Sequence, residues 1–142
     1  MKLTELEKFM LKEINEDYHK IGIENTEFYN TFGNDAKFNK ELRGAFASLE
    51  KKGIVKHTND PGCFNPIYPT RQFIDAMEEM GEQVDDTVIR WVRNEEATIK
   101  YGKEYNEWVE RENAYNYTDE NGLRYWKYPF KKWLKENHNI EL

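Results

Sequence analysis

The stretch that decides the fold is residues 42–77, which read LRGAFASLEKKGIVKHTNDPGCFNPIYPTRQFIDAM. Apolar residues at three- and four-residue steps predict a helix over residues 36–52, and Gly53 stands where a C-cap glycine belongs. Turn formers fill residues 58–65 between two short apolar segments, which predicts a β-hairpin with its tip in that range. Thr70 then has the position of an N-cap for a further helix. The order in this stretch is helix, hairpin, helix.

Two more helices are expected before it. Thr4 and Glu7 have capping-box spacing, so a first helix is predicted to begin at Thr4 or one residue earlier and to end near Gly22. A short second helix is predicted over residues 25–32, followed by a turn. The predicted order for residues 1–81 is therefore helix, short helix, turn, long helix, hairpin, helix.

The segments 49–55 (LEKKGIV) and 68–70 (YPT) resemble the LExxGLI and LTxxG motifs that flank the wing of MarR-like bacterial winged-helix regulators. The resemblance covers residues 3–80. It implies a mainly α fold with a small β-hairpin, with a winged helix-turn-helix domain over residues 1–81 and a C-terminal helical or hairpin extension over 82–142. The function it implies is sequence-specific binding of double-stranded DNA by a bacterial or phage transcription regulator, although winged helices also serve as protein-binding modules.

The extension begins with two apolar stripes of helical period. One stripe consists of Val84, Val88, Trp91, Val92 and Ile99. Another, rotated by roughly 120°, consists of Tyr101, Tyr105 and Trp108. Either the helix breaks near Gly102, or one long helix has two apolar faces. After it we expect a hairpin and then a short terminal helix.

Aromatic residues are concentrated in this extension, which holds all four tryptophans and six of the nine tyrosines. Most are expected to build the extension's own core, but a segment this small cannot bury all of them. Trp and Tyr are favoured at interface hot spots, and the resembled regulators dimerise through helices outside the DNA-binding domain. We therefore expect a homodimer. The predicted partner or dimer interface residues are Trp91, Tyr101, Tyr105 and Trp108.

The charge balance limits the kinds of partner. The chain has 21 basic and 27 acidic residues and a net charge of −6, divided evenly between the two predicted domains. DNA binding must therefore rest on a local basic face, because contacts to phosphates dominate non-specific affinity. The single cysteine, Cys63, excludes an internal disulfide, and the charged N-terminus resembles neither a signal peptide nor a membrane span. The expected location is the cytoplasm.

The outer face of the 36–52 helix is the best candidate for DNA contact. Opposite its apolar stripe, helical geometry places lysines interleaved with Gly44 and Ala47, a pattern that suits close approach to phosphates. Asn39 could pair with adenine, and two basic residues flank the hairpin. Protein contact and an ordinary solvated face are the alternatives. The predicted DNA-binding residues are Lys37, Asn39, Lys40, Arg43, Lys51, Lys56 and Arg71.

The hairpin tip is less suited to DNA. Residues 58–65 contain no basic side chain, whereas the resembled regulators carry an arginine there, and Asp60 would repel phosphate. The rival hypothesis is a protein–protein interaction module on a winged-helix scaffold, such as a phage-encoded inhibitor of a host defence or transcription complex. An acidic protein of this kind could occupy a partner's nucleic-acid groove.

No catalytic residue, metal site or cofactor is expected. His57, Asp60 and Cys63 are spaced by three residues across the turn, but structural zinc sites usually need four nitrogen or sulfur ligands. Cys63 has no histidine partner near it that would make a catalytic pair, and there is no glycine-rich phosphate loop. The sequence predicts a protein that is not an enzyme.

Overall fold

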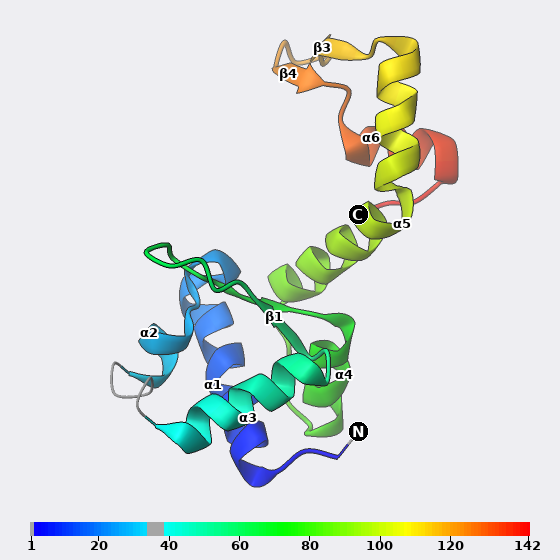
Figure 1. Cartoon of the computed structure of the whole chain (residues 1–142). Coiled ribbons are helices and arrows are strands. Elements are labelled where there is room, and N and C mark those ends of the chain that lie inside the picture. Colours follow the sequence, from blue (N-terminus) through cyan, green and yellow to red (C-terminus); the bar gives the residue numbers. More distant parts are fainter. Residues whose placement is uncertain (1, 34–38) are drawn as a thin grey trace. The chain divides into compact units, whose positions relative to one another are not determined.

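The computed structural model describes residues 2–33 and 39–142, which are mainly helical with two small antiparallel β-hairpins (Figure 1). The chain divides into two compact units, Met1–Val92 (unit 1) and Arg93–Leu142 (unit 2), so the division lies later than the expected boundary after residue 81. The elements of unit 1 are α1 (Glu5–Ile21), η1 (Ile23–Asn25), α2 (Phe28–Phe32), α3 (Lys40–Lys51), β1 (Val55–His57), β2 (Ile67–Pro69) and α4 (Arg71–Glu79). Helix α5 (Asp86–Glu112) supplies residues to both units, and β3 (Tyr115–Thr118), β4 (Arg124–Lys127) and α6 (Phe130–His138) complete unit 2.

Helix α1 begins at the predicted capping box. The Thr4 hydroxyl accepts a hydrogen bond from the Glu7 amide (3.1 Å), and the Glu7 carboxylate accepts one from the Thr4 amide (3.0 Å). Both groups satisfy amides that the first helical turn leaves without partners. The helix ends at Gly22, whose φ of 88° lies in the region that glycine enters without a Cβ penalty. Its buried face enters the core of unit 1.

The predicted second helix over residues 25–32 is wrong in its first half. A 3-10 turn, Ile23–Asn25, is followed by extended backbone at Glu27, and α2 starts only at Phe28. The reason is tertiary: Glu27 forms an isolated antiparallel bridge with Pro66, and the Ile67 amide donates to the Thr26 carbonyl (2.8 Å). A third extended segment, at Thr26 and Glu27, therefore lies beside the two strands of the β1–β2 hairpin.

Helix α3 also starts later than predicted. Asn39 has extended backbone (φ −87°, ψ 104°) and is the N-cap, its side-chain oxygen accepting from the amides of Glu41 (3.0 Å) and Leu42 (3.1 Å). The helix predicted to begin at residue 36 therefore begins at Lys40, while residues 36–38 themselves lie outside the described residues. The C-terminal end is close to the prediction, with Lys51 as the last helical residue.

The first hairpin follows α3 where it was predicted. Strands β1 and β2 pair with Val55 opposite Pro69 and His57 opposite Ile67. Thr70 is the N-cap of α4 as predicted, but its hydroxyl donates to the carbonyl oxygens of Gly53 (2.5 Å) and Ile54 (2.8 Å) and makes no capping bond. The side chain thereby ties the start of α4 to the segment between α3 and β1.

Helix α5 is continuous through Gly102, so the alternative of one long helix with two apolar faces is the correct one. Val88 belongs to the core of unit 1, whereas Tyr105 and Val109 pack around Trp133 in the core of unit 2. The two stripes seen in the sequence serve two different cores. None of the helices within residues 2–33 and 39–142 is both long and apolar enough to span a membrane.

The four aromatic residues predicted for an interface all take part in packing within the chain. Trp91 stacks on Tyr68 (ring centroids 5.1 Å apart) in unit 1, and Tyr105 is buried in unit 2, where its hydroxyl donates to the Tyr128 carbonyl. Tyr101 and Trp108 are half-buried against the same cluster. The most exposed tryptophan is instead Trp126 on β4, at 77%.

Candidate functional site

The outer face of α3 carries the described cations that were predicted for DNA contact. Lys40, Arg43 and Lys51 are exposed, with the exposed Gly44 and Ala47 between them, because the opposite face of the helix is committed to the core. None of these three cations forms an ion pair with another described residue. At 1.5 Å per residue, Lys40 and Lys51 start from backbone positions about 16 Å apart along the helix.

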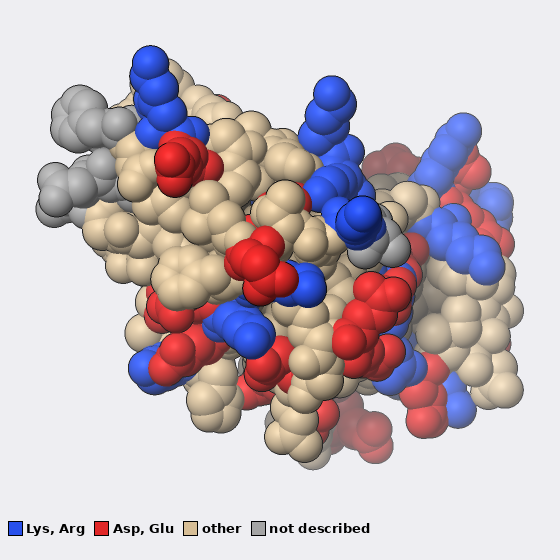
Figure 2. Space-filling model, turned by 90° about the horizontal axis from the view of Figure 1, so that it is seen from below, with Lys and Arg blue, Asp and Glu red and all other residues tan. Residues whose placement is uncertain are grey.

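The remaining predicted DNA-binding residues have other positions. Lys37 lies outside the described residues, and the Asn39 side-chain oxygen is occupied by capping, which leaves only its amide nitrogen to donate to a base. Lys56 is exposed on β1, and Arg71 is exposed at the first turn of α4. On the face seen in Figure 2, Lys and Arg are interspersed with Asp and Glu, so the residues described there form no continuous basic patch.

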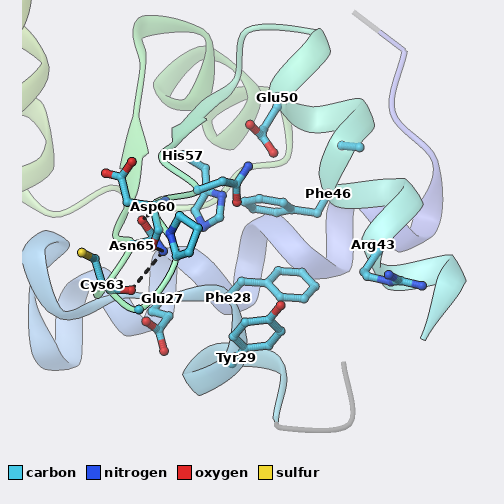
Figure 3. A pocket seen from close by; sticks show the side chains of 14 residues that line it. Glu27, Phe28, Tyr29, Arg43, Phe46, Glu50, His57, Asp60, Cys63 and Asn65 are labelled. Atoms are coloured by element: carbon cyan, nitrogen blue, oxygen red, sulfur yellow. Dashed lines mark hydrogen bonds between the residues drawn. The ribbon is translucent and has the colours of Figure 1, made fainter. Parts of the chain in front are cut away.

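A cleft of about 410 Å³, the hairpin cleft, lies between α2, α3 and the β1–β2 loop (Figure 3). Its floor is a row of rings: Phe28 contacts Tyr29 (centroids 5.4 Å apart) and Phe46 (5.0 Å), and His57 meets Phe46 edge to face at 5.2 Å. Phe28 and Phe46 are buried, whereas the Tyr29 ring is 44% exposed. The floor is therefore apolar and continuous across three elements.

The sides of the hairpin cleft carry an excess of negative charge. Glu27, Glu50 and Asp60 line it together with one guanidinium, that of Arg43, which lies at the α3 edge of the view in Figure 3. None of the four charged groups forms an ion pair with a described residue. Because the charges come from α2's N-cap, α3 and the hairpin loop, their proximity arises only in the folded chain.

The hairpin loop that closes one side is held by its own hydrogen bonds. The Asn65 side-chain oxygen accepts from the Thr58 hydroxyl (2.9 Å) and the Asp60 amide (3.0 Å), and its nitrogen donates to the Asp60 carbonyl (3.2 Å) and the Cys63 carbonyl (3.1 Å). The Cys63 amide also donates to the Asp60 carbonyl (3.1 Å) across Pro61 and Gly62, whose φ is 76°. Proline followed by a glycine with positive φ is the signature of a type II turn. The cleft wall is thus preorganised.

The sequence did not predict the hairpin cleft, although four of its lining residues were considered for other roles. Arg43 was predicted to contact DNA, whereas His57, Asp60 and Cys63 were weighed as metal ligands and set aside. All four line the cleft. Sequence reasoning missed Glu27, Glu50 and the aromatic floor, for which the sequence offers no local signal. Within the described part of the chain, no three His, Cys, Asp or Glu side chains are grouped so that they could hold a metal ion.

Comparison with protein-family models, with curated proteins and with solved structures gives no match to this chain. The functional argument therefore rests on the chemistry of the α3 face and of the hairpin cleft.

Proposed function

We propose that unit 1 is a winged helix-turn-helix domain that binds double-stranded DNA, with α3 entering the major groove, and that the protein is a transcription regulator. The order α1, extended Glu27, α2, α3, hairpin, α4 is the order of a winged helix, and in such domains the helix before the hairpin reads the groove. The extended backbone at Glu27, which pairs with Pro66 and so lies as a third extended segment beside the two hairpin strands, also supports the proposal.

The observation that carries the proposal is the row of unpaired cations on α3. Lys40 and Lys51 lie near the centre of the outer face, where small residues let a phosphate backbone approach closely. At 100° per residue, Glu41 and Glu50 fall about 90° to either side of that centre, so no carboxylate interrupts it. Much of the chain's acidity lies on other elements, and α1 alone carries five acidic residues.

In the proposed complex, α3 contacts the DNA and the acidic hairpin loop does not. A loop with Asp60 and without a basic side chain has no favourable contact with a phosphate backbone. Contact through α3 alone is modest in area, which fits a dimer that binds two half-sites about one helical turn apart. The homodimer is part of this proposal.

The test is fluorescence-anisotropy binding to a random-sequence duplex pool and to the DNA upstream of the protein's own gene, at low and moderate salt. Lys40→Glu/Arg43→Glu should weaken binding by more than tenfold and reduce the slope of log affinity against log salt by about 2, since each lost phosphate contact accounts for about 0.9. Lys103→Glu/Lys131→Glu makes the same charge change at exposed positions of unit 2 and should have little effect. Absence of binding at low salt, or equal losses in both variants, would refute the proposal.

One observation favours a second candidate function, a protein-interaction module. The hairpin cleft combines an apolar floor with carboxylates, and this combination has no use in phosphate binding.

A further inference from the structure

We propose that the hairpin cleft binds an arginine side chain presented by a basic peptide segment of a protein partner. The inference does not depend on DNA binding, because the residues that carry it face the hairpin and not the outer side of α3. It is drawn from the charge of the cleft, the nature of its floor and the surfaces beside it.

The charge of the cleft selects a cation. Three carboxylates, those of Glu27, Glu50 and Asp60, line it against one guanidinium, and none is neutralised by a described partner. Arg43 is drawn at the edge formed by the start of α3, whereas Asp60 lies on the opposite, hairpin side (Figure 3). A ligand cation can therefore approach Asp60 on the hairpin side without lying against Arg43.

The floor selects arginine among the cations. A guanidinium is planar and weakly hydrated, so it can stack on an aromatic ring within about 6 Å of the ring centre while its edge donates two hydrogen bonds to a carboxylate. The exposed Tyr29 ring provides the stacking surface, and the buried rings of Phe28 and Phe46 support it from below. Glu50 is one turn of α3 beyond Phe46. A lysine ammonium, which is compact and strongly hydrated, would use the rings less well.

The surroundings of the cleft indicate a peptide as the source of that side chain. Tyr29 on α2 is 44% exposed, and Phe64, which stands between two lining residues of the hairpin loop, is 49% exposed. The exposed Tyr29 side chain on the α2 border extends the binding surface beyond one side chain. A volume of about 410 Å³ matches a pocket that receives one anchor residue of a larger ligand, and the loop held by Asn65 needs little reordering on binding.

The experiment is a titration of the ¹⁵N-labelled full-length chain with the peptide acetyl-Gly-Gly-Arg-Gly-Gly-amide, followed by amide chemical shifts. The expected result is saturable shifts that concentrate at residues 27–29, 43–50 and 57–65, and none of this kind with the matched peptide in which Gln replaces Arg. Shifts spread evenly over acidic surfaces of both units, or equal responses to the two peptides, would overturn the proposal. So would localised binding of free agmatine, a guanidinium without a peptide backbone, if the Arg peptide did not bind.

Two variants of equal charge change locate the site. Glu50→Gln/Asp60→Asn should weaken the Arg peptide by about fivefold, the loss expected for two partly exposed ion pairs, and should leave DNA affinity unchanged or higher. Glu41→Gln/Asp75→Asn removes two carboxylates outside the cleft and should leave peptide affinity within twofold of the wild type. Equal losses of peptide affinity in the two variants would overturn the assignment. Neither pair of substitutions reaches the core, so both variants should fold, and the spectra of the free variants verify this. The DNA measurement is separate, so either proposal can fail while the other stands.

Discussion

The ion pair between Glu7 and Lys52 offers the sharpest test of how unit 1 holds α3 in place. The Glu7 carboxylate is 2% exposed, and its two oxygens accept from the Lys52 ammonium at 2.8 and 2.7 Å. The Ser48 hydroxyl (3.1 Å) and the Thr4 amide (3.0 Å) also donate to it. Because Lys52 directly follows α3, the pair fixes the start of α1 to the C-terminal end of α3.

Removing Lys52 should lower the free energy of unfolding by more than removing the charge of Glu7. Lys52→Met leaves the buried carboxylate without its cation, and breaking a buried pair on one side costs about 3–5 kcal/mol. We expect about 3 kcal/mol, because Ser48 and Thr4 still donate to the carboxylate. Glu7→Gln should cost about 1–2 kcal/mol, since glutamine can still accept from Lys52 and the 28% exposed ammonium can gain water.

The assay is urea unfolding of the wild type, both single variants and the double variant, followed by circular dichroism. In the double variant the cost should fall short of the sum of the single costs by at least about 1 kcal/mol, because the second substitution removes a partner that the first has already lost. Single costs that agree within about 0.5 kcal/mol, or costs that add fully, would refute the reasoning.

The same pair gives a pH dependence with a definite sign. Burial raises the pKa of Glu7, but the hydrogen bonds from Lys52, Thr4 and Ser48 outweigh it, so the net pKa lies below its ordinary value of 4.5. A carboxyl whose pKa is lowered by folding stabilises the fold above its unfolded pKa and loses that contribution as the pH falls through the folded pKa. The stability advantage of the wild type over Glu7→Gln should therefore be constant above about pH 5 and shrink below 4.5.

Two further predictions concern single hydrogen-bonded groups. The buried Tyr18 hydroxyl donates to the Ile67 carbonyl (2.6 Å), so Tyr18→Phe should lower stability by about 1–2 kcal/mol and speed hydrogen exchange in β2; an unchanged urea midpoint would contradict this. Asp85, just before α5, accepts from the Thr87 amide (2.9 Å), and this bond, with those from His19 and the Thr87 hydroxyl, lowers the pKa of Asp85 to about 2. Asp85→Ala should cost about 1 kcal/mol at neutral pH, and the cost should shrink as the pH falls from about 3.8 through about 2, because the carboxylate protonates first in the unfolded and then in the folded state. A cost at pH 2 as large as the cost at pH 7 would exclude the cap as its cause.

Local signals predicted those parts of the fold whose cause is local. The capping box at Thr4 and Glu7 and the turn formers of the first hairpin act through neighbours in sequence, and the structure has both where they were predicted. The sequence pattern of α5 also indicated that the helix contributes to two cores, since two apolar stripes about 120° apart cannot face one core. These features need no knowledge of what packs against them.

The features that were missed depend on contacts between distant segments. Glu27 leaves the helical conformation because Pro66 lies beside it, and no periodicity in residues 25–32 records that contact. Glu7 was recognised as a capping residue, but its second role needed Lys52 to lie within reach. The hairpin cleft is the extreme case, because its charges are ordinary surface residues of three separate segments until the chain folds.

The net charge of the whole chain does not describe the charge at each face of α3. Arg43 and Glu50 lie at the edge of the outer face that borders the hairpin cleft, about 10 Å apart along the helix axis, while Lys40 and Lys51 project outward. Phosphates that approach the outer face meet lysines, and a cation that approaches the hairpin side meets Glu50 and then Asp60. A net charge of −6 leaves the potential at such a local face largely unchanged, because charges beyond a Debye length of about 8–10 Å are largely screened. One helix can therefore serve both proposed partners, each through a different edge.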